Sequence, residues 1–341
     1  MESAGILNII GHEWAVQWMQ RGLAMGRTAH AYLLAGPPRI GKTTLALHLA
    51  QALNCTDRDN RPCGVCSACH RIARGVHPDV CVIDKLGKNI PIDEIRLLQS
   101  EASLSPYEGR YRVYILCNVQ HMQAPSANCL LKTLEEPPPK VVLVLTADET
   151  AGVLPTIVSR CQVLHMRPVG VDRIQRGLEQ RCEIEPERAR LLSRLSEGRV
   201  GWAIEACNDE TPLRNRDKYF VALEQALQST SHTCTERLSL AQQLSQNPQI
   251  LPDVLSLWQS WWRDVMLVKS GNAGALVNVD REQTLSHEAQ RLSWQEIIGC
   301  LHAIEHASQQ IEQNVNRELA VGTLLLKLPD PDLALSAPGT L

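Results

Sequence analysis

Eight residues near the N-terminus have the types and spacing of a phosphate-binding loop. Gly36-Pro37-Pro38-Arg39-Ile40-Gly41-Lys42-Thr43 fits G-x-x-x-x-G-K-[ST] at every fixed position. The glycines let backbone N–H groups turn toward phosphates, and the helix expected next, Thr44–Leu53, adds the positive end of its dipole. Lys42 would reach the β- and γ-phosphates, and Thr43 would bind Mg²⁺. A chance glycine-rich turn is the alternative, but the strand before the loop and the helix after it favour a nucleoside triphosphate site.

A second group of residues has the spacing of a metal site. Cys55, Cys63, Cys66 and Cys69 are spaced C-x7-C-x2-C-x2-C. Two thiolates separated by two residues can chelate one tetrahedral ion, and Pro62 and Gly64 permit the turn between them. A redox pair and plain buried thiols are the alternatives. Because the segment is polar, we predict one structural Zn²⁺ rather than buried thiols.

Efficient hydrolysis at a phosphate-binding loop needs an acidic pair at the end of a later strand, one acid for Mg²⁺ and one to activate water. The corresponding strand here, Val113–Leu116, ends in Cys117-Asn118. A thiol is a poor magnesium ligand and an amide has no useful basicity. Glu135 and Glu136 are nearby in sequence and could approach from elsewhere. The simpler prediction is nucleotide binding without efficient hydrolysis.

One arginine has a position that could serve a neighbouring subunit. Arg160, in Ser159-Arg160-Cys161, directly precedes an expected strand. An arginine there is usually an ordinary surface charge. In oligomeric ATPases, however, it can reach the γ-phosphate held by the next subunit, a task that suits a fixed guanidinium fork.

The elements that position these residues alternate in the first half of the chain. Most of the five expected strands are continuous apolar runs, as in a parallel sheet covered on both faces. Strand and helix alternate, which predicts an α/β doubly wound domain. The strands are expected at 31–35, 80–83, 113–116, 141–145 and 162–166.

Beyond Pro168 the pattern becomes helical. We expect a nucleotide-binding domain at 1–167 with a zinc module at about 55–69, a helical lid at 168–209, a helical domain at 210–330 and a tail at 331–341. In the helical domain Trp258, Trp261 and Trp262 fall at helical spacing. Core or subunit packing is expected there rather than a base-stacking site.

Composition excludes several function classes. The chain has 341 residues, a formal net charge of −3 and 4% aromatic residues. No global basic signature or aromatic platform for single-stranded nucleic acid is therefore expected. The N-terminus lacks the pattern of a signal peptide, and the longest apolar runs are too short to span a membrane. Twelve cysteines without a secretion signal favour a reducing compartment, so we expect a cytoplasmic protein without a membrane partner.

Together these residues resemble the clamp-loader branch of the AAA+ ATPases. The run from Asn128 to Pro138, NCLLKTLEEPP, is the most specific stretch. The resemblance extends over about residues 5 to 330 and is strongest before residue 162. The other matching stretches are 30–33, the phosphate-binding loop, the four cysteines, 154–161, 257–264 and 314–320.

The resemblance implies a P-loop AAA+ fold with a five-stranded parallel sheet, a small helical lid and an all-α collar domain. Motor subunits of the gamma/tau type carry Asp-Glu where this chain has Cys117-Asn118, so the departure is similar to the delta-prime type. Arg160 would then be an arginine finger acting in trans. The nucleotide, ATP or ADP with Mg²⁺, would contact Ile10, Gly11, His12, Gly36, Pro37, Pro38, Arg39, Ile40, Gly41, Lys42, Thr43, Thr44, Thr146 and Arg199.

The resemblance also implies partners. Such a chain would sit with gamma/tau and delta subunits in a pentameric clamp loader of the DNA polymerase III holoenzyme, acting on a sliding clamp and indirectly on primer-template DNA. It would be a non-catalytic subunit with weak or absent ATPase activity of its own. An active, short gamma-like motor and a stand-alone zinc-bearing nucleotide switch are the two alternatives.

Overall fold

The chain folds into two compact units, each described here by itself. The structure, a computed structural model, describes residues 9–57, 59–85, 89–228, 233–313 and 315–329. The first unit comprises residues 1–183 and 196–204, and the second comprises 184–195 and 205–341. Asn314, the N-terminal residues 1–8 and the expected tail at 331–341 lie outside the described residues. The partition into three domains and a tail stays a prediction.

The first unit is built on a parallel sheet, which confirms the predicted fold class. Its five strands run in the order β2-β3-β4-β1-β5, and every neighbouring pair is parallel. All five expected strands are present, with ends that differ by no more than two residues. They are β1 (Ala31–Ala35), β2 (Val80–Ile83), β3 (Arg112–Leu116), β4 (Val141–Ala147) and β5 (Gln162–His165).

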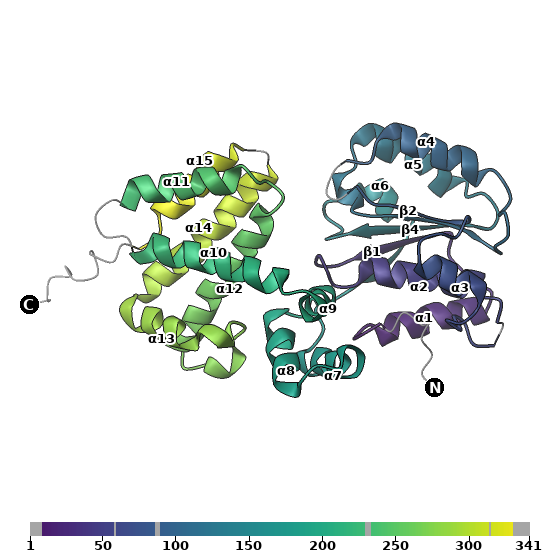
Figure 1. The fold of residues 1–341 in the computed structure, drawn as a ribbon. Coiled ribbons are helices and arrows are strands. Elements are labelled where there is room, and N and C mark those ends of the chain that lie inside the picture. The colour runs from purple at the N-terminus through teal and green to yellow at the C-terminus, as the bar shows by residue number, and fades with distance from the viewer. Residues whose placement is uncertain (1–8, 58, 86–88, 229–232, 314, 330–341) are drawn as a thin grey trace, which may run out of the picture. The chain divides into compact units, whose positions relative to one another are not determined.

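Helices cover both faces of this sheet, as continuous apolar strands require. On one face α1 (Glu13–Ala24) and α2 (Lys42–Asn54) pack Met19, Leu45 and Leu49 against the strands. On the other face lie α4 (Ile92–Ala102), α5 (Ala124–Glu135) and α6 (Pro155–Val158). Figure 1 shows these two helical layers on either side of the strands. The sheet is therefore buried on both sides, and its ends are free to carry a site.

The remaining elements of the first unit extend this core. The four spaced cysteines run from Cys55, which caps the end of α2, to Cys69 in the first turn of α3 (Ser67–Ala73). After β5 the chain continues into α7 (Val171–Cys182), and α9 (Val200–Asn208) begins within the unit. A 3-10 turn, η1 (Val119–His121), follows β3.

The second unit is helical throughout its described residues. Its central helix is α12 (Leu251–Lys269), which contacts α10, α13 and α14. The other elements are α8 (Pro186–Leu195), α10 (Thr211–Gln228), α11 (Thr233–Ser245), η2 (Ala273–Ala275), η3 (Val279–Arg281), α13 (Glu282–Arg291), α14 (Trp294–Glu312) and α15 (Arg317–Leu326).

The tryptophans of α12 lie in the core of the second unit. Trp258, Trp261 and Trp262 are each 0% exposed, and the Nε1–H of Trp258 donates to the Tyr219 carbonyl at 3.1 Å. Side chains this deeply buried cannot stack on a nucleic-acid base. The packing interpretation of the three residues is confirmed.

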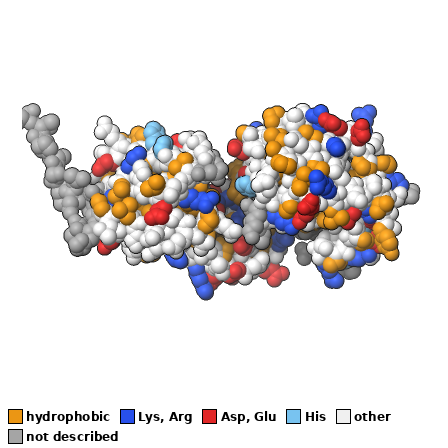
Figure 2. All heavy atoms as spheres, turned by 90° about the horizontal axis from the view of Figure 1, so that it is seen from above, with side chains coloured by type: hydrophobic (Ala, Val, Ile, Leu, Met, Phe, Trp, Pro, Cys, Tyr) orange, Lys and Arg blue, Asp and Glu red, His pale blue; other side chains and the backbone are white. Residues whose placement is uncertain are grey.

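Surface charge on the first unit is mixed. Figure 2 looks onto the layer of α4, α5 and α6 and shows basic and acidic side chains interspersed rather than gathered into a patch of one sign. In the part of the chain that the structure describes, no helix has both the length and the apolar character needed to cross a membrane.

Candidate functional site

The predicted phosphate-binding residues lie where the carboxyl ends of three neighbouring strands meet. β1 leads into the loop 36–43, β3 leads to Cys117, and β4 carries Thr146 near its end. Because the strands are parallel, these ends share one edge of the sheet, the usual place for a ligand in such folds. The sequence-predicted group from Gly36 to Thr44 is thus contiguous with Thr146.

The backbone of the loop has the conformation that its residues favour. Gly41 is the N-cap of α2 with φ +105°, a value that side chains other than hydrogen rarely permit. At Gly36, a Cβ atom would lie 2.3 Å from the Met166 carbonyl oxygen, so only glycine fits beside β5. Lys42 and Thr43 stand in the first turn of α2. The loop therefore leads directly into a helix N-terminus, a favourable place for phosphate.

Two residues outside the loop hold its carbonyl groups. His12 Nε2 lies 3.2 Å from the Ile40 oxygen, and the Gly201 N–H donates to the Arg39 oxygen at 2.7 Å. Burial lowers the pKa of His12, so the ring is neutral and Nε2 carries the donated proton. The contact gives His12 a positioning role for the loop.

The two residues that replace the usual acidic pair lie beside the loop. Thr43 Oγ1 is 3.7 Å from Cys117 Sγ, and burial raises the pKa of that thiol. Asn118 adopts the left-handed conformation, with φ +57°, and its N–H donates to Thr146 Oγ1 at 3.1 Å. A protonated thiol thus faces the position at which Thr43 would share a magnesium ion with an acid. This arrangement supports binding and not efficient hydrolysis.

Sequence reasoning missed one acid at this edge, Asp148. Its Oδ1 accepts from Lys42 Nζ at 2.7 Å, and its Oδ2 accepts from Gln120 Nε2 at 3.0 Å. The only signal in the sequence is the place of Asp148 shortly after the expected strand 141–145, because its closeness to Lys42 follows from the pairing of β4 with β1. The two acids considered instead do not fill this role: Glu135 pairs with Arg160, and Glu136 is exposed.

Arg160 lies at the opposite edge of the sheet from the phosphate-binding loop. It follows α6 and precedes β5, whereas the loop follows β1, and β1 and β5 are parallel. Its Nη2 is 2.8 Å from Glu135 Oε1, and its Nη1 donates to the Thr156 oxygen at 3.0 Å. Arg160 cannot reach the nucleotide site of its own chain from this edge.

The remaining predicted contacts occupy other positions. Ile10 borders a cleft of 1040 Å³ between α1 and α7, which Trp14, Arg173 and Arg176 also line. Arg199 is held locally, because its Nε donates to the Ser196 oxygen at 3.0 Å and its Nη2 lies 3.3 Å from Glu197 Oε1. Its role as a phosphate contact stays a prediction.

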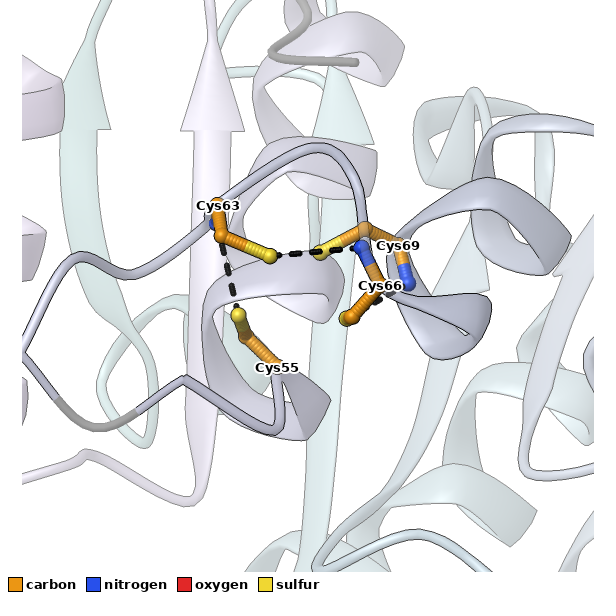
Figure 3. Close-up of side chains that lie close together, drawn as sticks. All are labelled: Cys55, Cys63, Cys66 and Cys69. Atoms are coloured by element: carbon orange, nitrogen blue, oxygen red, sulfur yellow. Dashed lines mark hydrogen bonds between the residues drawn. The ribbon is translucent and has the colours of Figure 1, made fainter.

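The four predicted metal ligands converge (Figure 3). The Sγ atoms of Cys55, Cys63, Cys66 and Cys69 all lie within 4.8 Å of one another. Tetrahedral zinc with Zn–S bonds of about 2.3 Å places its sulfurs roughly 3.8 Å apart, so the cluster has a suitable size. Cys55 comes from the end of α2 and Cys66 is the N-cap of α3.

Backbone N–H groups point at the sulfurs, which favours thiolates. Cys63 N–H donates to Cys55 Sγ at 3.3 Å, Cys66 N–H to Cys63 Sγ at 3.4 Å, and Cys69 N–H to Cys66 Sγ at 3.5 Å. Burial raises the pKa of Cys55 and Cys69. For Cys66, burial is outweighed by the N–H donors of Cys69 and Thr56, which lower the pKa to about 6. A soft dication fits this set of sulfur donors.

Comparison with known proteins agrees with the geometry. Residues 11–170 match the family model described as DNA polymerase III, delta subunit, and residues 215–330 match the one described as its C-terminal part. DNA polymerase III subunit delta' of Bacillus subtilis is 30% identical over 309 residues, which cover 89% of this chain and 92% of that protein. The chain belongs to the DNA polymerase III delta-prime family.

This family is related to the gamma and tau subunits. DNA polymerase III subunit tau of Escherichia coli is 36% identical over 197 residues, which are 56% of this chain but only 30% of tau. Among solved structures, a gamma subunit-related protein from Thermotoga maritima matches at a TM-score of 0.44 and 16% identity, covering 93% of this chain and 97% of that one. The strand order of the sheet itself, rather than this weak likeness, defines the fold.

Proposed function

We propose that the chain is a clamp-loader subunit that holds nucleotide without cleaving it efficiently. It would work with gamma/tau and delta subunits in a pentamer that places a sliding clamp on primed DNA. The observation that carries the proposal is the composition of one sheet edge, where a complete phosphate-binding loop faces Cys117 and Asn118 instead of two acids. Family membership supports the assembly, since the sequence is similar to both delta' and tau.

The nucleotide would enter with its phosphates on the N-terminus of α2. Backbone N–H groups of the loop and Lys42 would receive the phosphates, and Thr43 would supply an oxygen to Mg²⁺. His12 and Gly201 support the loop from outside, through the carbonyls of Ile40 and Arg39. The cleft beside Ile10 offers space next to the stretch expected to lie against the adenine.

The chain would then contribute to catalysis through Arg160, which would act on ATP bound by a neighbouring subunit. Arg160 precedes β5 and therefore lies across the sheet from its own loop. That position suits a finger presented to an adjacent subunit, where the guanidinium would stabilise charge on a γ-phosphate.

The cysteine cluster would hold one structural Zn²⁺. Cys55, Cys63, Cys66 and Cys69 supply four sulfur ligands, and a closed set of four leaves no open position for catalysis. When bound, the ion would cross-link the end of α2 to the start of α3.

Nucleotide binding and turnover test the proposal on the purified chain. We expect a fluorescent ATP analogue to bind and Lys42→Ala to abolish binding, since the phosphates lose their lysine. We also expect phosphate release to stay at background, because no acid pair activates water. Turnover at the rate of a gamma/tau subunit assayed alongside would instead identify an active motor.

A further inference from the structure

Lys42 of the phosphate-binding loop is fully engaged within the protein. Its Nζ donates to the Gly36 oxygen at 2.5 Å, to the Pro37 oxygen at 3.1 Å and to Asp148 Oδ1 at 2.7 Å. An ammonium group has three N–H donors, so all three are used. The side chain is only 7% exposed. A phosphate can therefore bind Lys42 only by displacing one of these acceptors.

Asp148 is the acceptor that a phosphate would displace. The two carbonyls belong to the loop itself, whereas Asp148 comes from the end of the neighbouring strand β4 and carries a full negative charge. Its second oxygen accepts from Gln120, which follows β3, so the carboxylate is held between two strand ends. This carboxylate presents a negatively charged oxygen to Lys42 at 2.7 Å, as a bound phosphate would.

We propose that Asp148 is an internal competitor of the nucleotide phosphates and sets the affinity of the site. This inference rests on the proposed nucleotide site and goes beyond it. While Lys42 is ion-paired with Asp148, its ammonium group is not available to a phosphate. Nucleotide binding therefore requires this ion pair to break. The apparent affinity is then the intrinsic affinity reduced by the fraction of molecules with the pair open.

The chain offers a matched control for the charge. Glu149 is the next residue and is exposed, and Glu149→Gln removes one negative charge beside the site without touching the contact to Lys42. Asp148→Asn keeps the shape of the side chain but removes the charge that holds the ammonium. Comparison of the two variants distinguishes the effect of breaking the Lys42–Asp148 ion pair from the effect of removing a negative charge near the site.

The experiment is a titration of the full-length chain with N-methylanthraniloyl-ATP, with and without Mg²⁺. We expect Asp148→Asn to lower the Kd by roughly three- to tenfold in both conditions, and Glu149→Gln to change it by less than about twofold. The lower Kd of Asp148→Asn should persist without Mg²⁺, because Asp148 and the phosphates compete for Lys42 and not for the metal ion. Asp148→Ser, measured in parallel, replaces the Asn variant if circular dichroism shows that the latter is unfolded.

Several outcomes would overturn the inference. An unchanged Kd shows that Asp148 does not limit binding, and a raised Kd that depends on Mg²⁺ makes Asp148 a ligand of the metal-nucleotide complex instead. Failure of both the wild-type chain and Asp148→Asn to bind would remove the inference and the proposed function together. If Lys42→Ala binds as tightly as the wild type, the proposed function fails because the analogue lies elsewhere.

Discussion

At the scale of single residues, the clearest separation is between the loop that would bind this chain's nucleotide and the arginine that would act on a neighbour's. Lys42 and Arg160 lie at opposite edges of one parallel sheet. Arg160 is partly exposed and is oriented by Glu135 and by the Thr156 carbonyl. An exposed ion pair of this kind contributes little to stability, typically below about 1 kcal/mol. The role of Arg160 is therefore open to a functional test that folding effects do not obscure.

Replacement of Arg160 by alanine should silence one ATP site of a reconstituted clamp loader. An arginine finger is worth on the order of 10³-fold or more at the site that it serves. We expect the DNA-stimulated ATPase rate of the complex with gamma/tau and delta subunits to fall by the fraction of the total rate that this one ATP site contributes. Arg188→Ala, an exposed arginine of α8, should leave the rate unchanged. Full activity of the Arg160→Ala complex would make Arg160 an ordinary surface charge.

Sequence patterns point to candidate residues whose spacing is local and miss one whose place depends on the fold. The loop 36–43 and the four cysteines are recognisable because their ligand atoms lie within short stretches of chain. Asp148 lies more than a hundred residues from Lys42 and meets it only because β4 is the neighbour of β1. The sequence pattern predicted a parallel sheet but not the order of its strands.

At the scale of elements, the cysteine module links two helices that also meet through a hydrogen bond from Gln51 to the Cys69 carbonyl. α2 ends at Asn54 and α3 begins at Ser67, and the four sulfurs gather between them. The loop between the helices is polar and has few apolar side chains with which to pack. A bound ion would supply the stabilisation that packing cannot.

Metal analysis of the purified chain should therefore find about one zinc per molecule. Cys63→Ser should remove it and lower the thermal midpoint, because metal binding to the folded state alone contributes to its stability. Cys81→Ser changes an exposed cysteine of β2 outside the cluster and should retain both the zinc and the midpoint. A folded, metal-free chain with four titratable thiols in the module would rule out the site.

The elements themselves were predicted well where apolar runs are continuous. All five strands were expected, and Thr44–Leu53 corresponds to α2. The boundaries shifted by one or two residues because strand ends are decided by pairing with neighbours, which the sequence pattern does not show. Residue 112, for example, extends β3 because it pairs with Val141 of β4.

At the scale of the whole molecule, the chain has more than one core. The sheet of the first unit is buried between two helical layers, and the second unit packs around α12. In the second core Phe220 lies against the guanidinium groups of Arg216 and Arg281, at 4.7 and 5.0 Å from the ring centre. Arg216 in turn binds Asp280 and Asn278. Phe220 and the three tryptophans of α12 thus pack in the interior of the second unit.

Truncation of Trp258 should destabilise the second unit strongly. The side chain is fully buried and its indole N–H is satisfied by Tyr219, so Trp258→Ala removes both packing and a hydrogen bond. We expect the free energy of unfolding to fall by about 3–5 kcal/mol, measured by urea denaturation and circular dichroism. Trp294, which is 44% exposed, is the control, and its replacement by alanine should cost far less. Equal losses for the two variants would contradict the packing role.

The left-handed backbone at Asn118 limits how easily this chain could become a motor. Asparagine tolerates φ +57°, whereas glutamate in that conformation costs roughly 1–2 kcal/mol. The Asn118 N–H is also fixed to Thr146, so the turn after β3 cannot relax independently of β4. Replacement of Cys117 and Asn118 by Asp and Glu would place the glutamate in a left-handed backbone conformation that asparagine tolerates better. The proposed lack of hydrolysis would then rest on the main chain at this turn as well as on the two side chains.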